Sequence, residues 1–259
     1  YGDKVKAVVI VHLYGVPGKI KEVKELCDKY NVVLIEDAAE SLTATYDGKQ
    51  TGSFGKYAAL SFNGNKLITT SGGGMVIAQE AKCAEKAKFW ATQAKEPVPY
   101  YLHKELGFNY RMSNITAGIG RGQFLHVDEH KKIKTEIYNR YKEGFKELPV
   151  KMNPYLKNTK PSHWLSAFSI DEELFEKGLT PEKLRIYLED LNIESRRVWN
   201  PMHLQPFFEK YDFIKVEDKA VSKDIFDRGL CLPSDIKMTE EEQAKVIEII
   251  NDFVKEFVG

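Results

Sequence analysis

The first half of the chain alternates short apolar runs with amphipathic stretches. Residues 6–11 and 32–35 are continuous apolar runs, the pattern of strands that are buried on both faces of a parallel sheet. Between them, residues 19–30 place apolar side chains at helical spacing. This order predicts a right-handed crossover between two neighbouring parallel strands. We therefore expect an α/β fold whose functional groups follow the carboxyl ends of these strands.

Later segments extend the same pattern. Residues 57–62 and 75–78 are predicted as further strands, and residues 80–92 as a helix. The run Tyr46-Asp47-Gly48-Lys49 predicts a hairpin turn, because Asp-Gly tolerates positive φ. Together these segments predict a mostly parallel sheet with helices packed against it.

A long helical pattern runs from about residue 113 to residue 148, as two helices or one bent helix. Ser113 is the predicted N-cap. Glycine is frequent inside this pattern, at Gly118, Gly120 and Gly122. We expect these glycines to allow close packing against another element.

Prolines after residue 148 mark a predicted domain boundary. We expect a large domain over residues 1–148 and a smaller α+β domain over residues 149–259. In the smaller domain, residues 164–170 are a predicted strand, and Thr180-Pro181-Glu182 begins a helix with a cap and a proline at its first position. A terminal amphipathic helix is predicted over residues 239–258.

Composition narrows the function classes. Lys+Arg and Asp+Glu both number 38, which argues against a nucleic-acid or membrane-surface role driven by bulk charge. No apolar run reaches transmembrane length and no signal-peptide pattern opens the chain. Three widely spaced cysteines favour reduced thiols in the cytoplasm, and six scattered histidines lead us to predict no metal site.

The start of the chain is unusual for a complete protein. The sequence reaches an apolar strand after six residues and has no initiator Met. We expect it to begin inside a domain.

Asp37 and Lys66 are the most informative pair of residues. Each follows a predicted buried strand, Asp37 directly and Lys66 after Ser61-Phe62-Asn63-Gly64-Asn65. A lysine amine can form a Schiff base with the aldehyde of pyridoxal phosphate, and a carboxylate can keep the pyridine nitrogen protonated. The alternatives are a solvated loop lysine and a helix N-cap or loop carboxylate. Glu36 is the competing acid, which strand alternation places on the opposite face from Asp37.

The residues around Lys66 suit a phosphate monoester. Ser61, Asn63 and Asn65 offer a hydroxyl and amides, and the glycines at 72–74 let the backbone approach a ligand. No Lys-Ser/Thr pair follows these glycines, so this is not a Walker loop. No GxGxxG follows a strand and precedes a helix, which leaves an NAD-dependent enzyme with little support.

Six linked motifs occur in one order along the chain. They are His12-Leu13-Tyr14-Gly15, Glu36-Asp37-Ala38-Ala39-Glu40, Gly52-Ser53-Phe54-Gly55, Ser61-Phe62-Asn63-Gly64-Asn65-Lys66, Thr69-Thr70 with Gly72-Gly73-Gly74-Met75, and Asn109-Tyr110-Arg111-Met112-Ser113-Asn114. Together they resemble the DegT/DnrJ/EryC1/StrS aminotransferases, sugar aminotransferases of pyridoxal phosphate fold type I. The resemblance covers nearly the whole chain.

The resemblance implies a role for each matching cofactor residue. Lys66 matches the Schiff-base lysine, which also shuttles the substrate proton, and Asp37 matches the partner of the pyridine nitrogen. Ala39 would pack on a ring face, and Glu40 would approach the ring hydroxyl.

The resemblance also implies how the phosphate is held and how the subunits pair. Ser61 matches a phosphate ligand, with Asn63 nearby. Asn109 matches an asparagine that reaches the phosphate from a neighbouring subunit, with Arg111 beside it. A homodimer with shared active sites is therefore implied, and His12 is placed near the mouth of the site.

A later segment resembles the part of this family that receives the sugar nucleotide. It runs from Arg196 to Pro206 and includes Arg197, Trp199 and His203. Arginines can pair with a pyrophosphate and a tryptophan can stack on a base or sugar. The alternative is an ordinary Pro-bounded loop with one buried tryptophan.

The implied activity is transamination of a keto nucleotide-sugar, with glutamate as the expected amino donor. The sequence is most similar to the branch that acts on UDP-4-keto-6-deoxy-N-acetylglucosamine, and a TDP-linked sugar or a non-sugar ketone is the rival substrate. The family carries a segment before the first strand of this sequence, which binds the cofactor phosphate and forms part of the dimer surface. We therefore also expect that this chain alone binds pyridoxal phosphate weakly or not at all and is inactive. The alternative from another class is a fragment or degenerate homologue that acts as a non-catalytic binding module.

Overall fold

The computed structural model describes residues 1–216 and 218–258, and their contacts divide the chain into two compact units. Unit 1 comprises residues 1–132 and 155–164, and unit 2 comprises residues 133–154 and 165–259. The boundary predicted from the prolines lies at residue 148. The contacts instead change within a helix near residue 132 and assign ten later residues to unit 1.

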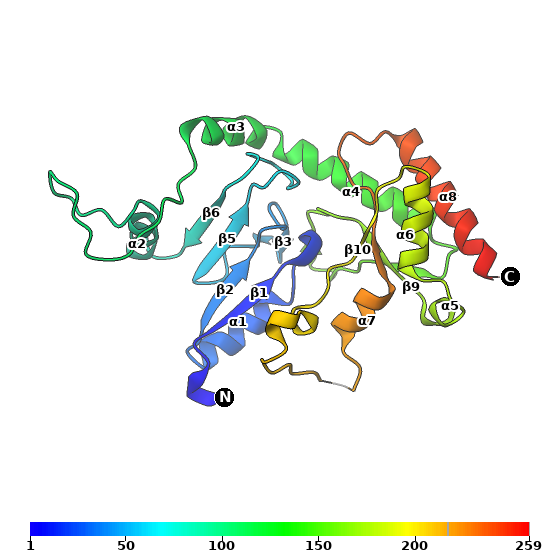
Figure 1. Cartoon of the computed structure of the whole chain (residues 1–259), viewed down its shortest axis with the longest axis horizontal. Coiled ribbons are helices and arrows are strands. Elements are labelled where there is room, and N and C mark those ends of the chain that lie inside the picture. The colour runs from blue at the N-terminus through cyan, green and yellow to red at the C-terminus, as the bar shows by residue number, and fades with distance from the viewer. Residues whose placement is uncertain (217, 259) are drawn as a thin grey trace. The chain divides into compact units, whose positions relative to one another are not determined.

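Unit 1 is built on a four-stranded sheet with the order β1-β2-β5-β6 (Figure 1). The strands are β1 (Ala7–Val11), β2 (Val33–Asp37), β5 (Tyr57–Ser61) and β6 (Gly74–Ala78). β1, β2 and β5 are parallel, and β6 runs antiparallel to β5. Helix α1 (Ile20–Lys29) connects β1 to β2. The predicted crossover and the α/β class are confirmed, with a mixed sheet.

One face of this sheet packs against α1. Ile20 and Cys27 of the helix join Leu34 of β2 and Tyr46 in a buried apolar cluster. Burial alternates along β2, so Leu34 and Glu36 are buried while the residues between and after them are half-buried. This alternation confirms that neighbouring carboxylates on β2 lie on opposite faces.

A small sheet joins two distant parts of unit 1. β3 (Thr45–Tyr46) pairs with β4 (Lys49–Gln50) through the predicted hairpin, and also with β8 (Thr159–Lys160). Asp47 and Gly48 have φ values of 48° and 78°, the paired positive angles that a type I′ turn requires. The hairpin prediction is confirmed, and β8 brings the later segment 155–164 into unit 1.

Helix α2 (Ala81–Ala91) follows β6, and the long helical pattern forms two helices, α3 (Asn114–Phe124) and α4 (Val127–Gly144). Ser113 caps α3 as predicted, because its hydroxyl accepts the Thr116 N–H at 3.2 Å.

The three glycines of α3 do not behave alike. A methyl group at Gly120 would lie 2.7 Å from Thr70 Cγ2, so this glycine allows the predicted close packing. At Gly118 and Gly122 the same methyl would meet no described atom within 4 Å, and the packing prediction is wrong there.

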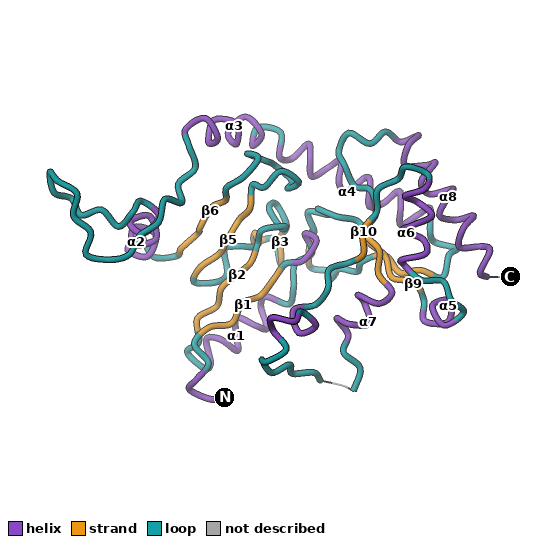
Figure 2. Tube along the Cα trace, in the orientation of Figure 1, coloured by secondary structure: helices purple, strands orange, loops and turns teal. Residues whose placement is uncertain are grey.

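Unit 2 contains an antiparallel sheet with the order β10-β11-β9-β7, and helices surround its strands (Figure 2). The strands are β7 (Val150–Met152), β9 (Ala167–Ile170), β10 (Arg196–Arg197) and β11 (Gly229–Cys231). The strand predicted over residues 164–170 is shorter than expected: β9 begins only at Ala167, and Trp164 belongs to unit 1.

The helices of unit 2 are α5 (Glu172–Glu176), α6 (Pro181–Asp190), α7 (Val221–Arg228) and α8 (Glu240–Val258). α6 and α8 begin where the sequence predicts, whereas α5 and α7 were not predicted. Thr180 caps α6 by accepting the Lys183 N–H at 3.2 Å. At the start of α8, Thr239 and Glu242 cap each other's backbone N–H groups, at 3.1 and 2.8 Å.

Four short 3₁₀ helices complete the described elements: η1 (Gly2–Lys4), η2 (Leu13–Gly15), η3 (Met202–Leu204) and η4 (Pro206–Phe208).

Candidate functional site

The carboxyl ends of the three parallel strands lie at one edge of the unit 1 sheet. Val11 of β1 pairs with Asp37 of β2, which in turn pairs with Ala59 of β5. The segments that follow therefore leave the sheet side by side. They carry His12, Glu40 and Lys66, so the edge where an α/β sheet places its ligands holds most of the predicted cofactor residues.

The Lys66 loop is fixed by hydrogen bonds on both sides of the lysine. The indole N–H of Trp164 donates to Asn65 O at 2.7 Å. On the other side, His130 Nδ1 lies 3.0 Å from Leu67 O and so carries the proton of that hydrogen bond. Leu67 and the following Ile68 are buried in a small apolar cluster. The backbone that carries Lys66 is thus held by segments far away in the sequence.

The amine of Lys66 lies between a carboxylate and an aromatic ring. Its Nζ is 3.4 Å from Glu40 Oε1 and 3.9 Å from the centroid of the Trp164 ring. The Lys66 side chain is only 11% exposed, and that of Glu40 only 5%. The solvated loop lysine that composition alone would favour is therefore not what the structure contains.

Glu40 is a buried carboxylate with two different partners. Its Oε2 accepts the backbone N–H of Tyr14 at 2.7 Å, which leaves Oε1 to face Lys66. Burial raises the pKa of Glu40, and the Tyr14 hydrogen bond and the Lys66 charge only partly offset that rise. The nearby charge of Asp37 raises the pKa of Glu40 slightly further. Glu40 is consequently a stronger base than an ordinary surface glutamate.

Asp37 and Glu36 occupy different environments. Asp37 is half-buried, and its Oδ1 accepts the Ala39 N–H at 3.1 Å. The described hydrogen bonds to Asp37 include none at Oδ2. Glu36 is fully buried, and protein donors occupy both of its oxygens. Of these two acids, Asp37 is the one with an oxygen to offer a ligand.

Glu36 organises the turn that follows the hairpin. Its carboxylate accepts the backbone N–H groups of Gly52, Phe54 and Gly55, each at 2.6 Å, and lies 3.0 Å from His12 Nε2. Burial by itself raises the pKa of Glu36. The hydrogen bonds from His12 and the three backbone groups outweigh this effect, so the pKa lies below its ordinary value.

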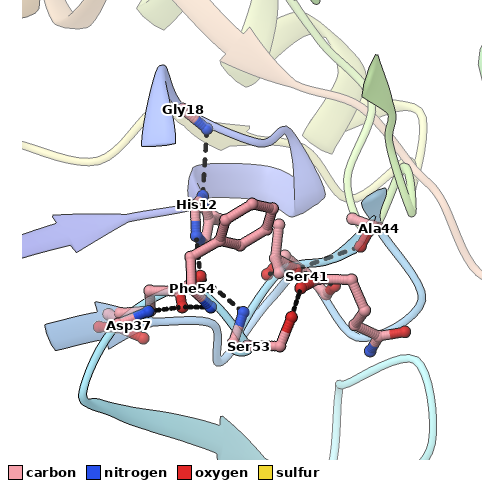
Figure 3. A network of polar contacts seen from close by, with 12 residues as sticks. His12, Gly18, Asp37, Ser41, Ala44, Ser53 and Phe54 are labelled. Atoms are coloured by element: carbon pink, nitrogen blue, oxygen red, sulfur yellow. Dashed lines mark hydrogen bonds and ion pairs between the residues drawn. The ribbon is translucent and has the colours of Figure 1, made fainter. Parts of the chain in front are cut away.

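His12 is enclosed in this network (Figure 3). Its Nδ1 accepts the Gly18 N–H at 3.1 Å, so Nε2 carries the proton and donates to Glu36. The side chain is fully buried, and both ring nitrogens are engaged within the protein. Its predicted place at the mouth of the site stays a prediction, and in this chain His12 ties β1 to β2.

The predicted phosphate ligands lie at the end of β5. Ser61 is half-buried and its Oγ accepts the Asn63 N–H at 3.3 Å, while Asn63 itself is exposed. Ala39, predicted to lie against a ring face, is half-buried directly after Asp37 and Ala38. These residues share the sheet edge with Lys66 and present oxygen and N–H groups to it.

Asn109 and Arg111 lie on an exposed segment between α2 and α3 (Figure 1). Asn109 forms a single antiparallel bridge with Thr92. Tyr110, between them, is 76% exposed and stacks on Phe108 with ring centroids 4.8 Å apart. No described contact joins Asn109 or Arg111 to Lys66, and their roles stay predictions.

The predicted nucleotide-sugar residues all belong to unit 2. Exposed Arg196 is paired with Glu194 at 2.6 Å. Arg197 donates to Phe226 O, at the end of α7, at 2.6 Å. Trp199 is 49% exposed, so it is not the buried tryptophan of an ordinary loop.

His203 stacks on Phe213 with ring centroids 3.7 Å apart, in the same part of unit 2. Exposed aromatic side chains surround this region, so it offers stacking surfaces. Arg197, by contrast, uses Nη2 to cap a helix.

Sequence reasoning missed two residues of this site, His130 and Trp164, and gave no role to Tyr14, although Tyr14 lies in the first of the six motifs. The sequence predicts that Trp164 begins a strand. The pattern of apolar residues after Pro161 does not indicate that the Trp164 side chain contacts Lys66. His130 was one of six scattered histidines, and its place on α4 could be found only from the fold.

The residues of unit 1 fit pyridoxal phosphate. An enclosed amine suits its aldehyde, a half-buried carboxylate suits its ring nitrogen, and Ser61 with the neighbouring amides suits its phosphate. Within residues 1–216 and 218–258, no cluster of three or more His, Cys, Asp or Glu side chains could hold a metal ion. Across the same residues, no helix is both long and apolar enough to cross a membrane.

Known proteins are similar to this chain over almost its whole length. A putative pyridoxal phosphate-dependent aminotransferase, EpsN of Bacillus subtilis (strain 168), is 45% identical over 96% of this chain and 63% of its own length. GDP-perosamine synthase of Escherichia coli O157:H7 is 34% identical over 97% of the chain and 66% of its own length. The chain thus spans slightly less than two thirds of these curated relatives.

Solved structures share the fold. PseC of Helicobacter pylori, an aminotransferase involved in the biosynthesis of pseudoaminic acid, superposes with a TM-score of 0.87 at 22% identity, over 97% of this chain and 67% of its own. The aminotransferase TlmJ of Streptoalloteichus hindustanus gives 0.88 at 22% identity, over 100% and 68%. Fold type I, predicted from the sequence, is confirmed.

The family assignment rests on almost the whole chain. Residues 2–251 match the DegT/DnrJ/EryC1/StrS aminotransferase family. Pyridoxal phosphate is the cofactor of this family, as the name of the Bacillus relative also states. The enclosed lysine, the half-buried aspartate and the match over residues 2–251 agree, and the chain belongs to the DegT/DnrJ/EryC1/StrS aminotransferases.

Proposed function

We propose that this chain carries the cofactor centre of an aminotransferase that acts on a nucleotide-linked keto sugar. The observation that carries this proposal is the enclosed Lys66 amine, which faces Glu40 at the sheet edge that also holds Asp37. A structural lysine in an ion pair would explain the contact with Glu40. It would not explain why the pair lies where Asp37, Ser61 and a run of glycines also converge.

Each residue at this edge has a proposed part in holding the cofactor. Lys66 would hold the aldehyde, Asp37 the ring nitrogen, and Ser61 with Asn63 the phosphate. Ala39 would lie against the ring, and its small side chain leaves room for one. When bound, pyridoxal phosphate withdraws electrons from the carbon that loses or gains a proton.

The chain itself must move that proton. Lys66 Nζ can carry it to and from the substrate carbon only after losing its own proton. Glu40 Oε1, at 3.4 Å, is the carboxylate within reach of that proton, and burial raises the pKa of Glu40 above its ordinary value. Tyr14 holds the other oxygen of Glu40, so the acceptor keeps its orientation.

The substrate class follows from relatives and from unit 2. Curated relatives are named GDP-perosamine synthase and UDP-4-amino-4,6-dideoxy-N-acetyl-beta-L-altrosamine transaminase. These names support a nucleotide sugar without choosing its nucleotide. We propose UDP-4-keto-6-deoxy-N-acetylglucosamine as the first substrate to test, with TDP- and GDP-linked keto sugars as rivals and glutamate as donor. Trp199 and His203 are proposed as stacking contacts and Arg196 as a phosphate contact.

A homodimer is part of the proposal. The exposed segment with Asn109 and Arg111 would reach the phosphate site of a second subunit, which would explain why no described contact joins it to Lys66. A cytoplasmic setting is proposed as well, because the widely spaced cysteines suit a reducing compartment.

The test is a titration with pyridoxal phosphate, followed by borohydride reduction and peptide mass spectrometry. We expect one dominant adduct on Lys66 in this chain. Lys66→Ala should abolish the adduct, whereas Lys24→Ala removes an exposed lysine paired with Asp28 and should leave the adduct unchanged. Product analysis with glutamate and UDP-, TDP- and GDP-linked keto sugars then identifies the substrate.

Two results would redirect the proposal. Labelling spread over many lysines, and equal in Lys66→Ala, would contradict the cofactor site. If no adduct formed in this chain but one formed in a chain extended to the length of the Bacillus relative, the result would favour the alternative of a non-catalytic fragment.

A further inference from the structure

We infer that Trp164 is a positioning residue for Lys66: its ring face holds the amine beside Glu40, and its N–H fixes the backbone next to the lysine. This inference deepens the proposed function, on which it rests for the working role of Lys66. Trp164 lies outside all six motifs that identify the family in this sequence. It lies in residues 155–164, a segment of the second half of the chain that belongs to unit 1.

The segment that carries Trp164 contacts the chain after each of the three parallel strands. Ser162 donates its N–H to Gly15 O at 2.9 Å, after β1. The Ser162 hydroxyl donates to Glu40 O at 3.0 Å, after β2. The Trp164 indole donates to Asn65 O at 2.7 Å, after β5. Three hydrogen bonds from two residues of one segment, Ser162 and Trp164, therefore fix the separate strand ends relative to one another.

Gly15 shows how closely this segment approaches. Its φ is 83°, and a methyl group at this position would lie 2.1 Å from Ser162 Oγ and 2.9 Å from Trp164 N. Tyr14, just before it, stacks on the Trp164 ring with centroids 6.5 Å apart. The indole is thus held by a ring contact on the β1 side and by its N–H on the β5 side.

The amine contact goes beyond ordinary core packing. A buried tryptophan needs a partner for its N–H, and Asn65 O supplies one. Packing does not require an ammonium 3.9 Å from the ring centroid, where the negative face of the ring attracts it. Trp164 is 2% exposed and the Lys66 side chain 11% exposed, so water screens this attraction little.

The first experiment measures acylation of Lys66 without pyridoxal phosphate. An isotope-coded amine reagent is applied at one pH, and the rate at Lys66 is divided by the rate at Lys131, whose amine donates to Thr43 O in the same unit. Trp164→Leu removes the ring face and the N–H. We expect this ratio to rise roughly two- to thirty-fold, the range for loss of one cation–π contact. Trp164→Phe should give a smaller rise, because it keeps a ring.

Trp90→Phe is the matched control. Trp90 is 43% exposed and its N–H donates to Glu105, so this substitution should leave the ratio unchanged. An unchanged ratio in both Trp164 variants overturns the inference. If Trp164→Leu unfolds unit 1, acylation of Lys131 accelerates as well, and the decision passes to Trp164→Phe and to fluorescence.

The fluorescence experiment leaves Trp164 in place. In a Trp90→Phe, Trp199→Phe chain, Trp164 is the remaining tryptophan of three. Lys66→Met removes the charge beside its ring and should shift or strengthen the emission, whereas Lys131→Met should not. Identical emission from the Lys66→Met chain and its parent overturns the inference.

Failure of the inference can be told apart from failure of the proposed function. Acylation and fluorescence are measured without cofactor and report only on the contact between Trp164 and Lys66. If the unsubstituted chain forms no Lys66 adduct with pyridoxal phosphate, the proposed function fails whatever these readouts show. If the adduct forms and neither readout responds to Trp164, the inference alone is wrong.

Discussion

The interiors of the two units differ in how far apolar clusters dominate them. Unit 2 buries a large apolar cluster, to which α4, α6, α8, β9 and β11 all contribute, and beside it the polar residues Lys134, Ser166, Ser234 and Gln243. The described part of unit 1 contains smaller apolar clusters, and between its strand ends it buries polar side chains. Those polar residues are His12, Glu36, Glu40, Ser41, Thr51 and Ser162.

Apolar clusters and buried polar networks contribute differently to the stability of the fold and to the construction of a site. An apolar cluster stabilises a fold in proportion to its buried area and tolerates volume-conserving changes. A buried polar network stabilises the fold only while every partner is present, because each unpaired group carries a desolvation cost. The buried polar network of unit 1 therefore holds its side chains in defined positions, but it tolerates substitutions less well than the apolar cluster of unit 2.

The largest expected effect is at Glu36. Glu36→Gln should destabilise the chain by roughly 3–5 kcal/mol, because His12 and three backbone N–H groups lose the charge that they surround. Hydrogen exchange followed by mass spectrometry should show the loss in β2 and β5 peptides and not in α8 peptides. Glu25→Gln, at an exposed position on α1, should change stability by less than about 0.5 kcal/mol. Equal effects of the two substitutions would contradict the proposed contrast between the units.

A matched pair on α6 tests unit 2. Leu184 is fully buried and Ile186 is 46% exposed on the same helix. Leu184→Ala should cost about 2–5 kcal/mol through lost burial and the cavity that remains. Ile186→Ala should cost less than about 1 kcal/mol. Denaturant unfolding measures both, and hydrogen exchange should place the loss in α6 and α8.

The two buried glutamates of unit 1 should give opposite pH dependences. The folded pKa of Glu36 is lowered, so its stabilisation is fully present above about pH 4.3, the unfolded value, and is lost as the pH falls through the folded value. The folded pKa of Glu40 is raised, so stability from this group falls as the pH rises from about 4.3 through the folded value.

Unfolding midpoints measured across this acid range check both signs. Against the unsubstituted chain, Glu36→Gln should flatten the loss of stability on acidification, and Glu40→Gln should remove a loss that occurs on raising the pH. The same slope in both variants would show that the two carboxyl groups do not differ as described.

The smallest expected effect is at the start of α8. Thr239→Ala removes the hydroxyl that accepts the Glu242 N–H and should cost about 1 kcal/mol. Thr239→Ser keeps the hydroxyl and should cost less, as measured by thermal unfolding. A larger loss at Thr239 than at Leu184 would mean that capping outweighs the apolar cluster in unit 2.

Local patterns predicted the elements well. The apolar runs, the Asp-Gly turn and the caps at Ser113 and Thr180 depend on neighbours within a few residues, so the sequence displays them directly. The contrast between Glu36 and Asp37 was predictable too, because a strand alternates its faces.

Contacts over long sequence separations were not predictable. The enclosure of Lys66 depends on Trp164 and His130, whose backbone partners lie 99 and 63 residues away. No local pattern distinguishes these rings from other aromatic residues. The sequence pattern does not mark the division between the units, because α4 continues through it without a break in helical pattern.

The return of residues 155–164 to unit 1 sets an order of events during synthesis. Asp37 at the end of β2 and the Lys66 loop after β5 leave the ribosome long before the segment that joins them. At about 5–20 residues per second, the 99 residues from Asn65 to Trp164 take on the order of 5–20 s to make. During that interval the lysine loop lacks its indole anchor, so a nascent chain cannot complete the enclosure of Lys66 until part of unit 2 has been translated.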